Sequence, residues 1–366
     1  MYNSGRNPER TTPRERPDTG LAFMLRYENI AWYEDGAVRI LDRRCYPRTV
    51  SFVTCRSFRE VAQAIADMVT QSAGPYPAAA MGMALAAYEC RNRTEAEQRA
   101  YLSEAADCLT HARPTTARRM ARICEQMTEA AEKAWASGTD AAEAIKARAI
   151  EANDSRYRKI ARIAEHLVGR FPDHGTILTQ CFAETIVGMM LKEARAKGKD
   201  LRIFCPETRP YFQGARLTAT VCCEMGFDVT VITDNMPAFV MQHERVDVFT
   251  SAADAICMDG HVVNKVGTFQ IAIAANHLGV PYYVTGAPDL VHPTVDTVRI
   301  EFRDPRFVLE AMGQKTACDG VKGYYPAFDI TPPELVTGVV TDRGIFDPKD
   351  LWRYAEGGMD AYEVTV

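Results

Sequence analysis

The sequence lacks the short motifs that hold a metal, a structural disulfide pair or a nucleotide. Its 11 cysteines include no Cys-x-x-Cys and its 7 histidines include no His-Glu-x-x-His, so we expect no metal site. It has no Gly-x-Gly-x-x-Gly turn and no Walker lysine loop, so we expect no nucleotide or dinucleotide cofactor. An odd number of irregularly spaced cysteines is typical of a reduced protein, and we expect a cytoplasmic location.

Long apolar runs and an excess of one charge are also missing. No segment approaches the ~18 apolar residues of a membrane helix, and the Arg- and Pro-rich start does not resemble a signal peptide. The net charge is −5, with acidic and basic residues mixed along the chain, whereas a nucleic-acid binder normally shows a basic stripe. We therefore expect no membrane and no nucleic-acid partner. A local basic pocket for a phosphate remains compatible with this composition.

The composition and the hydrophobic pattern of the 366 residues change twice along the chain. Residues 1–20 have the composition of a disordered tail. Residues 21–56 alternate apolar and polar side chains around short turns, which predicts a small antiparallel meander. From there to about residue 171, Ala, Glu, Arg and Met recur at helical spacing, with helix starts expected at Ser57, Pro114 and Asp140. The sequence therefore predicts an N-terminal β-meander and helical domain over 21–171.

Beyond residue 172, short apolar runs alternate with helical stretches. This pattern predicts βαβ units and a buried parallel sheet, so the fold class is α/β with a Rossmann-like, doubly wound catalytic domain over 172–366. In such sheets ligands bind beyond the carboxyl ends of the strands. The polar residues expected at that edge are Gln180, Cys181, Glu207, Arg209, Asp234 and Asp254.

Cys181 is the first candidate for catalysis. It ends a predicted strand in ILTQCFAE and directly precedes a predicted helix. Backbone dipoles at a helix N-terminus lower the pKa of a thiol, so we expect Cys181 to act as a base or nucleophile near neutral pH. The alternative is a cysteine that packs as a small apolar side chain, which is the commoner state of a single cysteine.

Asp254 is the second candidate. It follows another predicted strand in the apolar segment SAADAI. A carboxyl group in apolar surroundings has a raised pKa, which suits a general acid. The alternative is an aspartate that caps a helix or closes a turn.

Further residues could bind a phosphate or sugar hydroxyls. Asn264 and Lys265 stand at a probable helix start in NKVGTF, where amide groups and the helix dipole favour an anion. Arg113 precedes a Pro-started helix, and Gln213 could face the same cleft. The alternative for Lys265 is a surface lysine beside a cap. For three other basic residues we favour a solvated patch: Arg118, Arg119 and Arg122.

One thiol, one carboxylate and phosphate-binding cations around one sheet edge suit proton transfer on a phosphorylated sugar. An aldose–ketose isomerisation moves a proton between adjacent carbons and needs an acid for the ring oxygen. It needs no redox cofactor.

The same segments resemble the methylthioribose-1-phosphate isomerase family, whose relatives include the regulatory subunits of eukaryotic initiation factor two-B. The resemblance rests on WYEDGAVRILDRRCYP, ARPTT, ILTQCFAE, RPYFQGARLTA, SAADAI, MDGHVVNKVGTF and YPAFDITPPELVTGVVTDRGI, in the family's order. It implies a homodimer that converts a 5-substituted ribose 1-phosphate into the ribulose 1-phosphate, as in methionine salvage. It implies Cys181 and Asp254 as catalytic residues, and as substrate-binding residues Arg113, Gln213, Asn264 and Lys265.

Several positions depart from the family pattern. Gln71 stands where the family has an arginine, and Gln180 and Phe182 replace the histidine and asparagine beside the catalytic cysteine. These changes indicate a remodelled pocket, so S-methyl-5-thioribose 1-phosphate and 5-deoxyribose 1-phosphate both stay open as substrates. One alternative is a ribose-1,5-bisphosphate isomerase, which would need cations for two phosphates. Another is a non-catalytic regulatory protein that binds a sugar phosphate or nucleotide.

Overall fold

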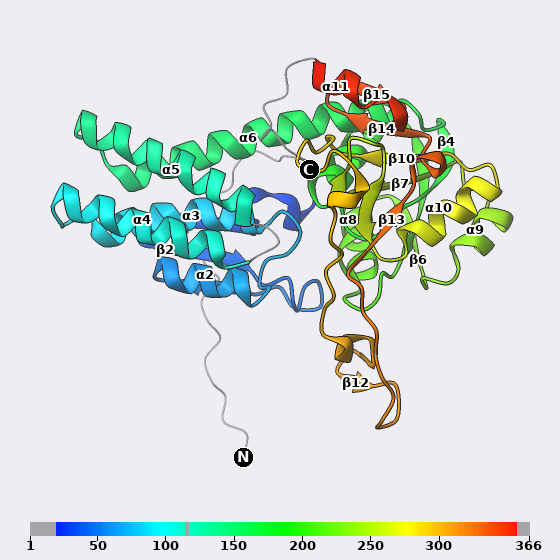
Figure 1. The fold of residues 1–366 in the computed structure, drawn as a ribbon, viewed down its shortest axis with the longest axis horizontal. Helices are drawn as coiled ribbons and strands as arrows, with labels where there is room; N and C mark the ends of the chain where they lie inside the picture. The colour runs from blue at the N-terminus through cyan, green and yellow to red at the C-terminus, as the bar shows by residue number, and fades with distance from the viewer. Residues whose placement is uncertain (1–19, 114–116, 357–366) are drawn as a thin grey trace.

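A helical part and a sheet part adjoin each other in the computed structural model, which describes residues 20–113 and 117–356 (Figure 1). The long helices extend away from the sheet on one side, and the last turns of α6 pack on the sheet. Apart from Gly20, the tail expected over 1–20 lies outside the described residues, as does the helix start expected at Pro114. Within the described ranges no helix combines the length and apolarity needed to cross a bilayer.

The predicted antiparallel meander is confirmed. It consists of β1 (Ala31–Glu34), β2 (Ala37–Leu41) and β3 (Phe52–Cys55), paired in that order. The β1–β2 turn is made by Asp35 and Gly36, both with positive φ (51° and 73°). Two short helices precede the meander: η1 (Phe23–Leu25) and α1 (Tyr27–Ile30).

The helical part surrounds one apolar helix. Its members are α2 (Phe58–Ala66), α3 (Pro75–Cys90), α4 (Glu95–His111), α5 (Ala117–Ser137) and α6 (Ala141–Val168). The Ala- and Met-rich α3 is buried along most of its length because α2, α4, α5, α6 and the meander all pack on it. The predicted starts at Ser57 and Asp140 are confirmed, since each side chain accepts a hydrogen bond from the backbone N–H three residues on.

The C-terminal part contains a seven-stranded sheet in the order β15-β14-β10-β7-β4-β5-β6. Its strands are β4 (His174–Leu178), β5 (Asp200–Pro206), β6 (Asp228–Ile232), β7 (Val248–Ala252), β10 (Tyr282–Thr285), β14 (Gly338–Thr341) and β15 (Gly344–Phe346). All neighbours pair in parallel except β15, which closes one edge as an antiparallel strand. The expected parallel sheet is confirmed, with this antiparallel edge as an addition.

Helices cover both faces of the sheet. One apolar cluster joins α7 (Thr185–Ala196), α8 (Ala219–Glu224) and the end of α6 to one face, and another joins α9 (Pro237–His243) and α10 (Thr268–His277) to the other. A π-helical turn, η3 (Gly214–Thr218), leads into α8. The remaining helices are short: η4 (Val295–Thr297), η5 (Pro305–Val308), η6 (Pro333–Leu335), η7 (Pro348–Asp350) and α11 (Trp352–Glu356).

The strand order reverses between β4 and β7. The chain runs from β4 outward through β5 to β6, then returns to place β7 on the other side of β4. The loops that follow β4 and β7 therefore leave in opposite directions and open a crevice at their carboxyl ends. This topology brings the segments after Leu178 and after Ala252 to the same edge of the sheet.

Two features had no counterpart in the sequence prediction. A second sheet, β13-β9-β8, is formed by β8 (Ala255–Ile256), β9 (Val262–Lys265) and β13 (Phe328–Thr331). Between η4 and β13, a segment that carries β11 (Glu310–Ala311) and β12 (Gln314–Lys315) projects from the sheet part as an arm (Figure 1). The second sheet depends on the pairing of β9 with the distant β13, which local periodicity does not report. The arm carries only a two-residue hairpin pair, too short to give a periodic signal.

Candidate functional site

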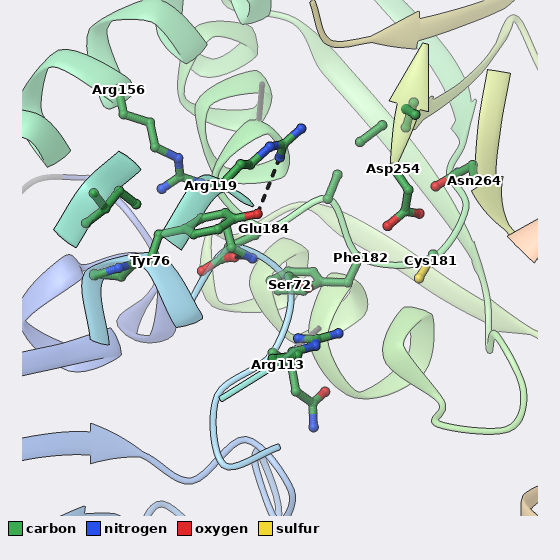
Figure 2. A pocket seen from close by; sticks show the side chains of 18 of the residues that line it. Ser72, Tyr76, Arg113, Arg119, Arg156, Cys181, Phe182, Glu184, Asp254 and Asn264 are labelled. Atoms are coloured by element: carbon green, nitrogen blue, oxygen red, sulfur yellow. Dashed lines mark hydrogen bonds between the residues drawn. The ribbon is translucent and has the colours of Figure 1, made fainter. Parts of the chain in front are cut away.

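A cavity of about 570 Å³ lies between the helical part and the carboxyl edge of the large sheet. Its lining comes from α3, α5 and α6 on one side and from the loops after β4 and β7 on the other. Figure 2 shows Cys181, Asp254 and Asn264 near one another on one side of it. The lining includes Gln180 and every residue named as catalytic or substrate-binding: Arg113, Cys181, Gln213, Asp254, Asn264 and Lys265. Three other residues expected at the same edge of the sheet do not line the cavity: Glu207, Arg209 and Asp234.

Cys181 lies in the loop between β4 and α7, with its backbone held in the left-handed region (φ 57°). Its N–H donates to Thr208 Oγ1 (3.2 Å), and its carbonyl accepts from Thr218 Oγ1 (2.5 Å). These threonines belong to the loop after β5 and to η3, so two separate segments fix the backbone at Cys181. A non-glycine residue in this conformation is sparsely populated and is typical of functional sites.

The thiol of Cys181 is a weak acid in this setting. Burial raises the pKa of Cys181 to about 11, and the nearby positive charge of Lys265 only partly opposes that rise. The expected lowering of the pKa by a helix N-terminus is wrong, because α7 begins at Thr185 and the dipole effect falls off within the first turn. The thiol therefore holds its proton at neutral pH.

Asp254 follows β7 and is anchored by its N–H, which donates to the Val263 carbonyl (2.8 Å). Its side chain is exposed to the cavity yet surrounded by protein, so it is removed from bulk water. Desolvation raises the pKa of Asp254, and four cations oppose that rise: Lys265, Arg303, Arg119 and Arg113. The rise agrees with the sequence-based expectation of a general acid.

Asn264 and Lys265 end the buried strand β9. Asn264 Nδ2 donates to Thr268 Oγ1 (3.1 Å), and Lys265 Nζ lies 5.0 Å from the ring centroid of Phe328. Burial lowers the pKa of Lys265. The amides at the start of α10 are not open to a phosphate as expected, because the N–H groups of residues 267 and 269 donate to the Asp329 carboxylate (2.6–3.2 Å). The ammonium group of Lys265 therefore remains as the anion-binding element of this segment.

Gln213 precedes the π-helical turn η3 and points a buried amide into the cavity. Its Oε1 has no hydrogen-bond partner among the described residues, and the same is true of Gln180 Oε1. A buried amide oxygen without a donor is costly, so both are suited to accept from a bound hydroxyl group. Gly214 allows η3 to approach β5, because a Cβ there would overlap the Pro206 carbonyl oxygen.

A buried ion pair ties the N-terminal part to the Cys181 loop. Arg43 Nη2 lies 2.7 Å from Glu184 Oε1, and the two side chains are 0% and 2% exposed. Glu184 Oε2 also accepts from the Ala73 N–H (2.6 Å). Glu184 therefore joins the loop before α3 to the loop after β4, and both of its oxygens are engaged.

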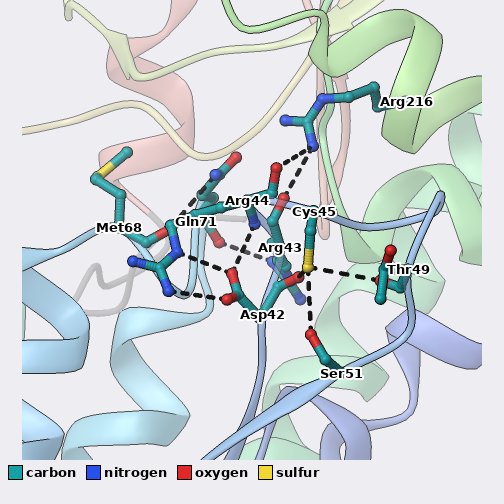
Figure 3. A network of polar contacts seen from close by, with 9 residues as sticks. All are labelled: Asp42, Arg43, Arg44, Cys45, Thr49, Ser51, Met68, Gln71 and Arg216. Atoms are coloured by element: carbon teal, nitrogen blue, oxygen red, sulfur yellow. Dashed lines mark hydrogen bonds and ion pairs between the residues drawn. The ribbon is translucent and has the colours of Figure 1, made fainter. Parts of the chain in front are cut away.

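Gln71, which stands where the family pattern has an arginine, has a structural role at its backbone. Figure 3 shows its carbonyl accepting from Arg43 Nη1 (2.8 Å), and its Nε2 reaches the Met68 carbonyl (3.5 Å). In the same network Arg216 Nη1 donates to the carbonyls of Arg43 and Tyr46 (both 2.9 Å).

Several cavity residues were not assigned to the site from the sequence. Arg119 and Arg122, expected in a solvated patch, line the cavity, and so do Arg156 and Arg303; the side chain of Arg118 lies outside what the structure describes. One pattern could have revealed Arg156. Positions 149, 152, 153 and 156 lie on one face of a helix, and all four line the cavity. Asn153 and Arg156 on a helix face that otherwise carries alanines indicate that this face lines a polar cavity.

Comparison with known proteins places the chain in a family. Residues 72–348 match the model of the initiation factor 2 subunit family. The chain is 37% identical to a methylthioribose-1-phosphate isomerase of Chloroflexus aurantiacus over 334 residues, covering 87% of this chain and 95% of the relative. It is 34% identical to the Desulforudis audaxviator protein of the same name, covering 87% and 94%.

Two solved structures share the fold. The 5-methylthioribose 1-phosphate isomerase of Pyrococcus horikoshii superposes with a TM-score of 0.81 at 29% identity, covering 90% of this chain and 96% of that one. The delta subunit of translation initiation factor eIF-2B from A. fulgidus gives a TM-score of 0.75 at 32% identity, covering 87% and 96%.

Proposed function

Because the chain belongs to the initiation factor 2 subunit family, and because its cavity joins a thiol to a carboxyl group among cations, we propose that it is an aldose–ketose isomerase of the methylthioribose-1-phosphate isomerase type. Its substrate is a 5-substituted ribose 1-phosphate and its product is the corresponding ribulose 1-phosphate. The candidates S-methyl-5-thioribose 1-phosphate, 5-deoxyribose 1-phosphate and ribose 1,5-bisphosphate differ only at C5.

One observation carries the proposal. Cys181 and Asp254 come from the loops after β4 and β7, the two strands between which the sheet reverses direction, and both side chains line one cavity. A regulatory protein that only binds a ligand needs neither a thiol nor a carboxyl group there. Lys265 and Asn264 lie beside the pair and would hold the 1-phosphate and a sugar hydroxyl.

The reaction conserves all atoms and electrons. Asp254 donates its proton to the furanose ring oxygen as the bond from C1 to that oxygen breaks. Cys181, as the thiolate, takes the proton from C2 and returns it to C1, while the C2 hydroxyl becomes the ketone and its proton restores the Asp254 carboxylic acid. No group outside the chain is required as oxidant or reductant.

This assignment requires the thiolate together with the carboxylic acid. Burial raises the pKa of both groups, and it raises the pKa of the thiol to about 11. Between the two macroscopic pKa values the pair holds a single proton, and the fraction of the competent form, thiolate with carboxylic acid, does not change with pH. We expect kcat/KM to be flat over that range and to fall on either side of it.

The remaining proposals concern context. We propose a homodimer that works in the cytoplasm. We also propose a pathway of the methionine-salvage type, which the name of the relatives supports. We also propose that the domain boundary lies at 171/172, since α6 ends at Val168 and the first strand of the large sheet begins at His174.

A panel of pentose 1-phosphates followed by NMR for ketose formation tests the function. The panel contains the methylthioribose, 5-deoxyribose and ribose 1-phosphates and ribose 1,5-bisphosphate. Turnover of at least one is expected, with Cys181→Ser and Asp254→Asn each reducing kcat by about 10²–10⁴-fold while leaving substrate binding largely intact. Near-normal turnover by either variant would refute the assigned roles. Tight binding of one sugar phosphate with no turnover of any would favour the regulatory alternative.

A further inference from the structure

The end of the cavity formed by α5 and α6 contains a half-buried cation that pairs with no carboxylate in the described part of the chain. Arg156, in the middle of α6, lines the cavity. Its Nε and Nη2 are buried and have no hydrogen-bond partner among the described residues. The one contact of its guanidinium given by the structure is with the neighbouring ring of Tyr157, whose centroid lies 5.8 Å away.

Such an arrangement is costly unless a ligand completes it. A guanidinium cannot lose its proton to escape the cost of burial, and a buried charge normally has an ionic or hydrogen-bonding partner. Glu184 lies near this end of the cavity in Figure 2, but Arg43 and the Ala73 N–H already engage its two oxygens. Glu184 is therefore not available to pair with Arg156.

A second cation faces the same space. Arg119, on α5, donates from Nη1 to the Tyr76 hydroxyl (3.4 Å), and no carboxylate within the described residues pairs with it. Two other arginines of the lining differ in this respect. Arg122 is paired with Glu125 (3.1 Å) and Arg303 with Glu301 (2.9 Å). Arg119 and Arg156 are thus available to an anion.

Arg156 is separate from the reactive end, whereas Arg119 also acts electrostatically on Asp254. Figure 2 shows Arg156 and Tyr76 on the side of the cavity opposite Cys181, Asp254 and Asn264, with Arg119 between them. A ribose 1-phosphate whose C1 and C2 lie at Cys181 and Asp254 extends C5 away from that end. Its 5-substituent therefore points toward α5 and α6.

We infer that Arg119 and Arg156 form a second anion subsite, and that the 5-substituent of the substrate carries a phosphate or carboxylate group. This inference rests on the proposed isomerase function and narrows its substrate class. A neutral 5-methylthio or 5-deoxy group would leave both guanidinium groups without an anionic partner, whereas a phosphate accepts from both.

The test compares substrates that differ only at C5 in the parent and in Arg156→Leu. The substrates are ribose 1,5-bisphosphate, its 5-carboxylate analogue, and 5-deoxyribose 1-phosphate as the neutral member. We expect the parent to prefer an anionic substrate, and Arg156→Leu to lower kcat/KM for that substrate by about 10–100-fold while leaving the neutral one within about twofold. Arg158→Leu, an exposed position on the same helix outside the cavity lining, is the matched control and should change neither value.

Arg156→Lys keeps a charge and should recover part of the loss in kcat/KM, which separates a charge effect from a folding defect.

Preference of the parent for either anionic substrate supports the subsite and identifies the anion. Preference of the parent for a neutral substrate overturns the inference and leaves the isomerase intact. An equal loss for all substrates in Arg156→Leu also overturns it, because the arginine would then hold the 1-phosphate. If nothing is turned over, the function fails, and calorimetry with ribose 1,5-bisphosphate on parent and Arg156→Leu still decides the subsite.

Discussion

The protonation state of Cys181 is open to direct measurement, because only the thiolate reacts with an alkylating reagent. The pKa of about 11, against an ordinary value of 9.0, corresponds to about 3 kcal/mol against the thiolate. At pH 7 the thiolate fraction is about 10⁻⁴, compared with about 10⁻² for an ordinary thiol. Alkylation of Cys181 at that pH should therefore be about 100-fold slower than the ordinary value allows.

The assay is iodoacetamide modification from about pH 6 to pH 10, with the peptide that contains residue 181 quantified by mass spectrometry. The rate should rise about tenfold per pH unit without a plateau. The exposed Cys318 in the same molecule serves as the internal reference, since its alkylation rate reports the reactivity of the reagent toward an accessible thiol. Lys265→Met should slow the reaction further, because the charge of Lys265 lowers the pKa of the thiol. A plateau below about pH 9 would refute the reasoning and restore an activated thiolate.

Two further predictions concern the supports of the site. Arg43→Met should lower the free energy of unfolding in urea by about 3–5 kcal/mol, because it leaves the Glu184 carboxylate buried without its partner. The double variant with Glu184→Gln should recover much of that loss, and an additive loss would contradict the explanation. Gly214→Ala should lower the melting temperature and kcat/KM together, because a Cβ would overlap the Pro206 carbonyl oxygen and displace Gln213. An unchanged melting temperature and an unchanged kcat/KM would show that η3 can shift to accept the Cβ without loss of stability.

The main elements of the fold and the catalytic candidates of the site could be predicted from the sequence because both leave a local signal in it. Alternation marks the meander, helical spacing marks the helical part apart from the uniformly apolar α3, and short apolar runs mark the strands of the parallel sheet. In a parallel sheet the strand ends meet at one edge, so a residue just after a strand is a site candidate before any contact is known. Cys181 and Asp254 were found in this way, and both line the cavity.

What the sequence determined alone was therefore the residue types and their place along each element. The tertiary structure decided the electrostatics, because those depend on groups far apart in the chain. The pKa of Cys181 rises because protein surrounds it and α7 starts too late to oppose the effect. The start of α10 is closed by Asp329, 62 residues beyond Gly267. Arg119 and Arg156 line the same cavity because α5 and α6 pack side by side, and no local pattern encodes the packing of two helices.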